Sequence, residues 1–327
     1  MTKDYFEFWN LQESVFLTPT DVARGIYIPT AQRKGVERLR MLLESTAAGS
    51  LFVLAGPDGS GKTTMARWLY HELSPRSHEV VHITLNAPVS ASGWLFDRLA
   101  RYFGEFPDHG GMTRALSEVA AEERRFLLIV DNAHHLINKR AWEDIIFFHS
   151  LENTISPLPF VLLPASMALD GILRSLPEVK ALIQFRLPFE PWTVEDGLAY
   201  FQFKTRDMGE PNPVLTRDAA VEMIRWSGAV PAAFNTLAEN CLMEAAMSNE
   251  TSITRDTVLA ALSWLTPEKA EEPLPRHVSL PPVPGDGESY SGEKDAQPAP
   301  PAASIEPDSD EIPLKSLLLN TEDKKTG

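Results

Sequence analysis

The chain has 327 residues, of which 43% are hydrophobic and 23% charged, with Cys241 as its single cysteine. One cysteine excludes a disulfide framework within the chain, and no apolar run approaches the roughly 20 residues that a membrane-spanning helix needs. The first residues lack the basic-then-apolar pattern of a secretory signal, so we expect a cytoplasmic protein without a transmembrane segment.

The net charge of −15 is divided between two unlike parts of the chain. Residues 266–327 hold 13 acidic and 6 basic residues, a net charge of −7, and residues 1–265 hold 32 acidic and 24 basic residues, a net charge of −8. Contacts with nucleic-acid phosphates need clusters of lysine and arginine. The mildly acidic body therefore argues weakly against broad nucleic-acid binding, while it leaves room for a local basic patch.

From residue 46 to residue 192, strand-like and helix-like stretches alternate. Short apolar stretches bounded by glycine, proline or polar residues predict five strands, at residues 51–55, 80–85, 126–131, 160–163 and 184–189. Helical patterns lie between or beside them, at residues 62–73, 93–103, 112–123, 139–151 and 168–175. This alternation predicts an α/β core with a mainly parallel sheet covered on both faces.

After residue 192 the strand signals stop, and residues 193–265 predict a small all-helical domain, hereafter the lid. Thr193 with an acid three residues later is typical of a helix start. Thr216 and Thr254 are expected to cap two more helices, and a further helix follows Pro231.

Residues 266–327, hereafter the tail, differ sharply in composition from the body. Residues 267–313 contain 11 of the 26 prolines, together with glycine, serine and acidic residues. Such a composition buries too little apolar surface to offset the entropy of ordering, and it predicts disorder. An apolar island at residues 312–319 is either a chance cluster or a docking motif for a protein partner.

Residues 56–63 read Gly-Pro-Asp-Gly-Ser-Gly-Lys-Thr and match the phosphate-loop pattern G-x-x-x-x-G-K-[ST] at every specified position. Its glycines let backbone amides approach phosphates closely, Lys62 can reach the outer phosphates, and Thr63 can ligate magnesium. The loop follows a predicted strand and opens a predicted helix, as the motif requires. The expected nucleotide-binding residues lie in this loop and the first turn after it: Gly56, Pro57, Asp58, Gly59, Ser60, Gly61, Lys62, Thr63 and Thr64.

A second half of such a site is an acid at the end of a buried strand. The apolar run from Phe126 ends in Asp131, which we expect to hold Mg²⁺ through water. The alternative is a buried strand that ends in a helix-capping aspartate, and the phosphate loop favours the metal. No guanine-reading Asn-Lys-x-Asp motif is present, which is compatible with ATP and Mg²⁺ as the expected ligands, and the family resemblance described next implies ATP.

With these motifs, residues 3–265 resemble the AAA+ ATPases of the ExeA (general secretion pathway A) type, which are related to the TniB and TnsC transposition ATPases. Tyr5-Phe6, Thr18-Pro19 and Tyr27 match the N-terminal signature, and Ser227–Pro231 followed by Asn235–Leu237 matches the lid. The resemblance implies a P-loop AAA+ core with a five-stranded sheet at residues 46–192, a helical lid and an N-terminal segment, residues 1–45, that packs on the core. The aromatic residues of that segment are expected either to cover the adenine or to join the core.

The chain departs from the family pattern at three places in this site. The family carries Asp-Glu-Ala where Asn132 stands here in place of the water-activating glutamate, and Ala232 stands in place of the lid arginine. Ser166 is the one polar residue where the family tends to have Gly-Gln. Loss of a general base costs about 10²–10⁴-fold in rate, and loss of a transition-state arginine costs on the order of 10³–10⁵. We therefore expect ATP binding with weak or absent hydrolysis.

Other side chains are candidates for the missing functions. The candidate catalytic residues are Asn132 and His134, which follow the magnesium acid, and Arg186, which falls where the family has an arginine after the fifth strand. Arg186 is the first candidate for an arginine finger supplied to a neighbouring subunit and Arg174 the second. The alternative for each arginine is a solvated charge on the surface, and the alternative for His134 and His135 is the ordinary polar character of a loop.

Three functions are compatible with these residues. The leading one is a nucleotide-dependent switch or scaffold that works as a homo-oligomer or with a paralogous AAA+ subunit. The first alternative is an active ATPase in which His134, His135 or Glu152 replaces the missing base. The second is a DNA-binding regulator of the transposition type, which the acidic body makes the less favoured alternative.

Overall fold

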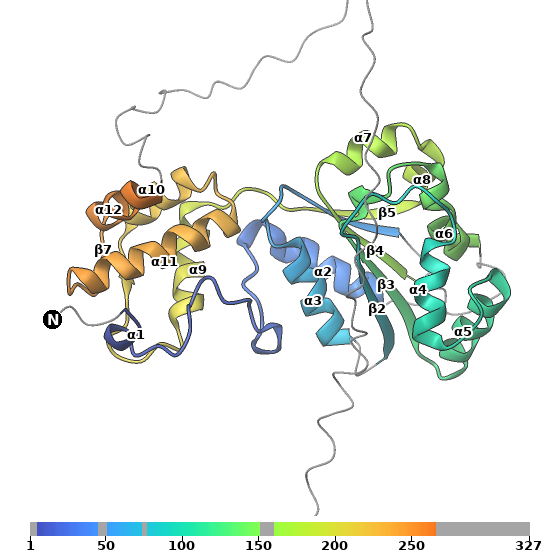
Figure 1. Ribbon diagram of the computed structural model, residues 1–327, viewed down its shortest axis with the longest axis horizontal. Coiled ribbons are helices and arrows are strands. Elements are labelled where there is room, and N and C mark those ends of the chain that lie inside the picture. Colours follow the sequence, from blue (N-terminus) through green and yellow to red (C-terminus); the bar gives the residue numbers. More distant parts are fainter. Residues whose placement is uncertain (1–4, 45–50, 74–76, 151–159, 266–327) are drawn as a thin grey trace, which may run out of the picture. The chain divides into compact units, whose positions relative to one another are not determined.

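The computed structural model describes residues 5–44, 51–73, 77–150 and 160–265. Five parallel strands form the central sheet in the order β2-β3-β4-β1-β5 (Figure 1). They are β1 (Leu51–Ala55), β2 (His78–Thr84), β3 (Arg125–Asp131), β4 (Phe160–Ala165) and β5 (Ile183–Pro188). The predicted α/β fold with a five-stranded parallel sheet is confirmed, and the strand ends differ from the predicted ones by at most two residues.

Helices cover both faces of the sheet. One face packs against α2 (Thr30–Glu44) and α3 (Lys62–Leu73), and the other packs against five further helices. These are α4 (Trp94–Phe103), α5 (His109–Ala121), α6 (Lys139–Ser150), α7 (Ala168–Arg174) and α8 (Pro177–Leu182). Because neighbouring residues of a strand point to opposite faces, Phe52 and Leu54 join the first layer while Leu51 and Val53 join the second. Burial on both faces explains why β1, β3 and β4 read as nearly continuous apolar runs.

The parallel direction of the strands determines where the site lies. The chain leaves β1 into the phosphate loop, and it leaves β3 at Asp131 and β4 just before Ser166. These strands are neighbours through β4, which pairs with both β1 and β3. Their carboxyl ends therefore bring the loop, the acid and Ser166 to one edge of the sheet, the edge at which ligands bind in open α/β folds.

The lid contains α9 (Val194–Thr205), α10 (Arg217–Trp226), α11 (Pro231–Met247) and α12 (Arg255–Leu265). The three predicted threonine caps are present: Thr193 forms a capping box with Asp196, Thr216 accepts from the N–H of Ala219, and Thr254 accepts from the N–H of Thr257. The expectation that no strand follows residue 192 is wrong. Val214–Leu215 (β6) and Ser252–Ile253 (β7) form a short parallel pair, and two residues are too few to show a period in the sequence.

The N-terminal segment divides its packing between the two parts of the fold. Helix α2 lies on the sheet, whereas Trp9 and Phe16 are buried in the core of the lid. The carboxylate of Glu239, which is fully buried on α11, accepts hydrogen bonds from the Tyr5 hydroxyl and from the Phe16 N–H at 2.9 Å. Residues 5–16 were expected on the core and instead pack on the lid, because their aromatic side chains complete its apolar interior.

Some expectations lie outside the described residues. They include the disorder of the tail, the docking island at residues 312–319 and the base candidate Glu152. Among the helices that the structure describes, none has the length and apolarity of a membrane span.

Candidate functional site

The phosphate loop joins β1 to α3 in a conformation that needs its glycines. Gly59 and Gly61 have φ angles of +77° and +96°, in the region that side chains other than glycine rarely adopt. Gly56 instead packs tightly, because a Cβ there would lie 2.6 Å from the Cβ of Phe189. The predicted loop residues thus form the tight turn between strand and helix that brings backbone amides to a phosphate.

Lys62 is buried at the start of α3 with 8% of its surface exposed. Its ammonium donates to the carbonyl oxygens of Gly56 at 3.0 Å and Pro57 at 2.7 Å. Burial lowers the pKa of Lys62, and the nearby carboxylates of Asp58 and Asp131 oppose that shift. The loop therefore holds a cation beside its own backbone, where an anionic ligand would compensate its burial.

Asp131 ends β3 with 1% of its surface exposed. One carboxylate oxygen, Oδ1, accepts from the N–H of Asn132 at 2.9 Å, and the buried Oδ2 has no hydrogen-bond partner among the described residues. Burial acts to raise the pKa of Asp131, but His82, the Thr63 hydroxyl and the Asn132 N–H together hold it below its usual range. Asp131 is thus a carboxylate with a free, buried acceptor next to Thr63. An acidic oxygen and a hydroxyl are ligands that Mg²⁺ accepts, so the two residues fit the ion.

His82 is a part of this site that the sequence did not indicate. Its Nε2 lies 3.8 Å from Oδ2 of Asp131, which is too long for a hydrogen bond, and it too is buried without a partner among the described residues. His82 stands on β2, opposite Ile129 of β3. Its approach to Asp131 depends on the pairing register of two strands more than 40 residues apart in the chain, and no local motif carries that information.

Asn132 occupies a left-handed backbone conformation, with φ +58° and ψ +38°. Asparagine tolerates this region better than most residues. Its side-chain amide donates to the carbonyl oxygen of Leu85 at 3.1 Å, just beyond the end of β2. The side chain therefore binds the backbone just after β2, and this hydrogen bond stabilises the turn after Asp131.

His134 lies in the short 3₁₀ turn Ala133–His135 that follows. Its Nδ1 accepts a hydrogen bond from the backbone N–H of Ser166 at 3.3 Å. Burial lowers the pKa of His134, the neighbouring His135 lowers it further, and the charges of Asp58, Lys62 and Asp131 also act on the ring. The ring of His134 therefore joins the end of β3 to the end of β4, at the edge of the sheet from which the phosphate loop leaves β1.

The lid contacts the phosphate loop directly. The N–H of Ala232, in the first turn of α11, donates to the carbonyl oxygen of Gly59 at 3.1 Å. The turn before α11 places Gly228 and Ala229 at φ +60°, and the Ala229 carbonyl accepts from the N–H of Trp192 at 3.1 Å. The position where the family has an arginine thus stands against the loop, and the residue there supplies a backbone contact in place of a cation.

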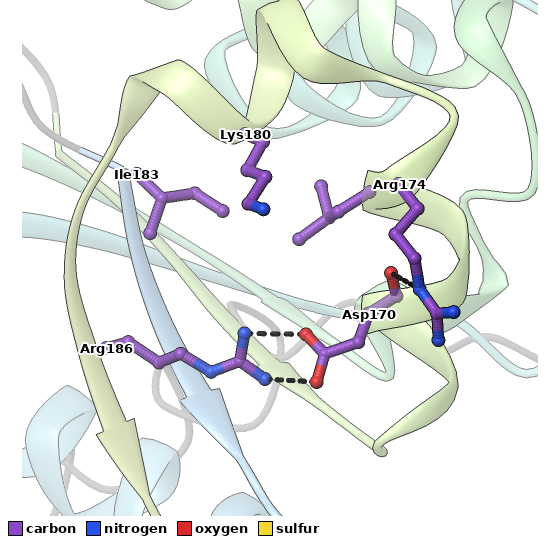
Figure 2. A pocket seen from close by; sticks show the side chains of 6 residues that line it. Asp170, Arg174, Lys180, Ile183 and Arg186 are labelled. Atoms are coloured by element: carbon purple, nitrogen blue, oxygen red, sulfur yellow. Dashed lines mark hydrogen bonds and ion pairs between the residues drawn. The ribbon is translucent and has the colours of Figure 1, made fainter. Parts of the chain in front are cut away.

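Arg186 and Arg174 line a separate pocket of about 450 Å³ formed by α7, α8 and β5 (Figure 2). The two terminal guanidinium nitrogens of Arg186, Nη1 and Nη2, donate to the carboxylate of Asp170 at 2.6 and 2.8 Å, and this pairing lowers the pKa of Asp170. Arg174 makes one long contact, from Nε to the carbonyl oxygen of Asp170 at 3.4 Å. Of the two finger candidates, Arg186 is neutralised by a local partner and Arg174 is the less engaged.

Comparison with known proteins agrees with this geometry. Residues 46–173 match the family model of the AAA domain. The chain carries an AAA domain. It is also 27% identical over 257 residues to general secretion pathway protein A of Aeromonas hydrophila, across 74% of this chain and 45% of that protein. This is a distant homology, and the chain spans less than half the length of that relative.

Solved structures of AAA+ proteins share the fold. The ORC2 protein of Aeropyrum pernix, solved as ADPNP–ADP complexes, superposes with a TM-score of 0.57 at 18% identity, over 78% of this chain and 73% of that one. The RuvB Holliday junction branch migration motor of Thermotoga maritima gives a TM-score of 0.51 at 20% identity, over 78% and 75%. At these identities the likeness shows the fold alone. An AAA domain implies nucleotide binding, and the phosphate loop at this edge of the sheet has the left-handed glycines that such binding requires.

Proposed function

We propose that the protein is a nucleotide-dependent switch or scaffold that binds ATP with Mg²⁺ and hydrolyses it slowly or not at all. The observation that carries the proposal is a contrast within the site. The chain has the groups that binding needs, namely the loop with its left-handed glycines and the buried side chains of Lys62 and Asp131. In contrast, Asn132 faces the Leu85 carbonyl and Ala232 offers no cation.

Binding would rest on the loop and three side chains. The loop amides and the N-terminus of α3 present partial positive charge to phosphate oxygens, and Lys62 would exchange its loop carbonyls for the outer phosphates. Thr63 and Asp131 would hold the metal. When bound, Mg²⁺ supplies neutralisation of the charge on the outer phosphates.

The chemical step lacks its usual aids. A water-activating group contributes about 10²–10⁴-fold in rate, and Asn132 is an amide that cannot accept a proton as a carboxylate does. Its hydrogen bond to Leu85 further directs it to the backbone of β2. Ground-state binding does not depend on either missing group, so the proposal separates binding from turnover.

The switch would act through the contact between loop and lid. Gly59 accepts from Ala232, so a ligand that reshapes the loop changes the surface on which α11 begins. Because residues 5–16 share the apolar core of the lid, they would move with it. A ligand shifts the equilibrium between two positions of the lid only by the difference in its affinity for them. That difference would arise at the Gly59 carbonyl, which binds the lid. Self-assembly through the surface around Arg174 is the output we favour, because AAA+ proteins commonly form oligomers.

The test of binding is calorimetric titration of ATP into the full chain, with and without Mg²⁺. Lys62→Ala should weaken ATP binding by about 10- to 100-fold, since hydrogen bonds to charged groups contribute about 1.5–3 kcal/mol. Lys34→Ala, an exposed lysine on α2, is the matched control and should leave binding unchanged. Equal affinity in the Lys62 variant and the wild type would overturn the proposal.

A further inference from the structure

The hydrogen bond between Ser166 and His134 determines which nitrogen of the imidazole ring carries the proton. A backbone N–H can only donate, so Nδ1 of His134 must present a lone pair to Ser166 at 3.3 Å. A neutral imidazole carries its proton on one nitrogen alone. In the neutral ring the proton is therefore on Nε2, which becomes a hydrogen-bond donor.

The surroundings keep the ring neutral. Burial and the adjacent His135 lower the pKa of His134, so the uncharged form is the one present near pH 7. The bond to Ser166, which follows β4, holds the ring at the carboxyl edge of the sheet, where the phosphate loop leaves the neighbouring strand β1. Nε2 has no hydrogen-bond partner among the residues that the structure describes, and a donor without a partner beside an anion-binding loop is suited to a phosphate oxygen.

We propose that His134 is a phosphate-sensing residue that donates Nε2–H to the outermost phosphate of the bound nucleotide. This inference rests on the proposed nucleotide binding. In this chain β4 ends in Pro164 and Ala165, and neither side chain can contact a phosphate through a hydrogen bond. The backbone N–H of Ser166 orients the ring of His134. At the end of β4, the contact with the phosphate would therefore be made by His134.

The same tautomer argues against His134 as the base of an active ATPase. Nε2 already carries a proton and cannot take another from water, and protonation of Nδ1 would cost the hydrogen bond from Ser166. A donor to the third phosphate also distinguishes ATP from ADP. His134 would therefore make the protein prefer ATP to ADP, without contributing to the hydrolysis of ATP.

The tautomer can be measured without any nucleotide. The full chain labelled with ¹⁵N at its 8 histidines would be studied by long-range ¹H–¹⁵N correlation at pH 7, with the His134 signals identified by their loss in His134→Gln. The inference predicts an unprotonated Nδ1 and a protonated Nε2. A ring with its proton on Nδ1, or a charged ring at this pH, would overturn it.

The sensing role is tested by comparing ATP and ADP affinities. His134→Ala should lose about 10- to 100-fold in ATP affinity and keep its ADP affinity, whereas His134→Gln, which retains an N–H donor, should keep much of the preference for ATP. His71→Ala, which replaces an exposed histidine in the last turn of α3, is the matched control and should behave as wild type. An unchanged ATP preference in His134→Ala would contradict the sensing role. Absence of ATP binding in the wild type would instead overturn the proposed function itself. The spectra of the free protein distinguish the two failures.

Discussion

The N–H of Ala232 donates to the carbonyl oxygen of Gly59 at 3.1 Å, and this bond joins the first turn of the lid helix α11 to the phosphate loop. A Cβ at Gly59 would lie 2.7 Å from the Cβ of Ala232. Gly59 therefore has two reasons to be glycine, its φ of +77° and its contact with the lid.

Gly59→Ala should loosen the lid from the loop in the free protein. Its partner variant is Gly61→Ala, which shares the strain of a positive φ but meets nothing within 4 Å. Both should lose about 1–3 kcal/mol of stability from the backbone, and Gly59→Ala alone should raise amide exchange across residues 228–235. Equal exchange in the two variants would show that the contact does not hold the lid.

Asn132→Glu should fail to restore hydrolysis although it recreates the residue of the family motif. Glutamate is strained at a φ of +58°, and its carboxylate would face the Leu85 carbonyl without a proton to donate. We expect a loss of about 1–3 kcal/mol, read from chemical denaturation, with phosphate release unchanged. Asn132→Gly, which relieves the φ but also lacks the donor, separates the two causes. A clear gain of turnover in Asn132→Glu would mean that residue 132 can reach the water.

Asp131→Asn should weaken ATP binding only when magnesium is present. Groups that hold a metal through water change its affinity by about 10- to 100-fold when they are replaced, and the effect on ATP affinity should follow. In EDTA the variant and the wild type should bind ATP alike. The control is Asp97→Asn, an exposed carboxylate on α4 with the same change of charge. Loss of binding in EDTA as well would point to damage of the loop instead of loss of the ion.

Asp196 should link the stability of the lid to pH. Its carboxylate accepts from the Tyr27 hydroxyl, the Thr30 N–H and Thr193. Burial acts to raise the pKa of Asp196, but these hydrogen bonds hold it below its usual range. Because the folded pKa is below the unfolded value of about 3.9, the stabilisation is complete above that pH and is lost as pH falls through the folded pKa.

Asp196→Asn should therefore cost about 1–3 kcal/mol at neutral pH, and the difference from wild type should shrink as the pH falls below about 4. Urea denaturation at several pH values measures both quantities. Glu195→Gln replaces the exposed neighbouring acid and should change stability little. A difference between Asp196→Asn and wild type that is independent of pH would exclude the carboxylate as its source.

Local sequence signals predict much of this fold. The strands β1, β3 and β4 are buried apolar runs, the loop is a complete motif, and Thr193, Thr216 and Thr254 cap the helices that they precede. Each of these features depends on residues a few positions apart. For the same reason the position of Asp131 at the end of a buried strand was predictable from the run that precedes it.

Other features depend on residues that are distant in the chain. His82 approaches Asp131 through the register of β2 and β3, and Arg186 on β5 pairs with Asp170 on α7, 16 positions earlier. The N–H of Phe16 donates to Glu239, 223 positions later in the chain. The direction of the Asn132 side chain depends on the Leu85 carbonyl, which lies just beyond the end of β2. These contacts follow from the assembled sheet and lid, and a single sequence carries no local pattern for them.

The central claim is that binding and turnover are separated in this protein, and one paired measurement tests it most directly. ATP affinity in the presence of Mg²⁺ and phosphate release would be measured on the same sample of the full chain. We predict micromolar binding that Lys62→Ala abolishes or strongly weakens, with phosphate release indistinguishable from that of the Lys62→Ala protein. Magnesium-dependent release well above that variant would contradict the account and would show that another group has replaced the missing base.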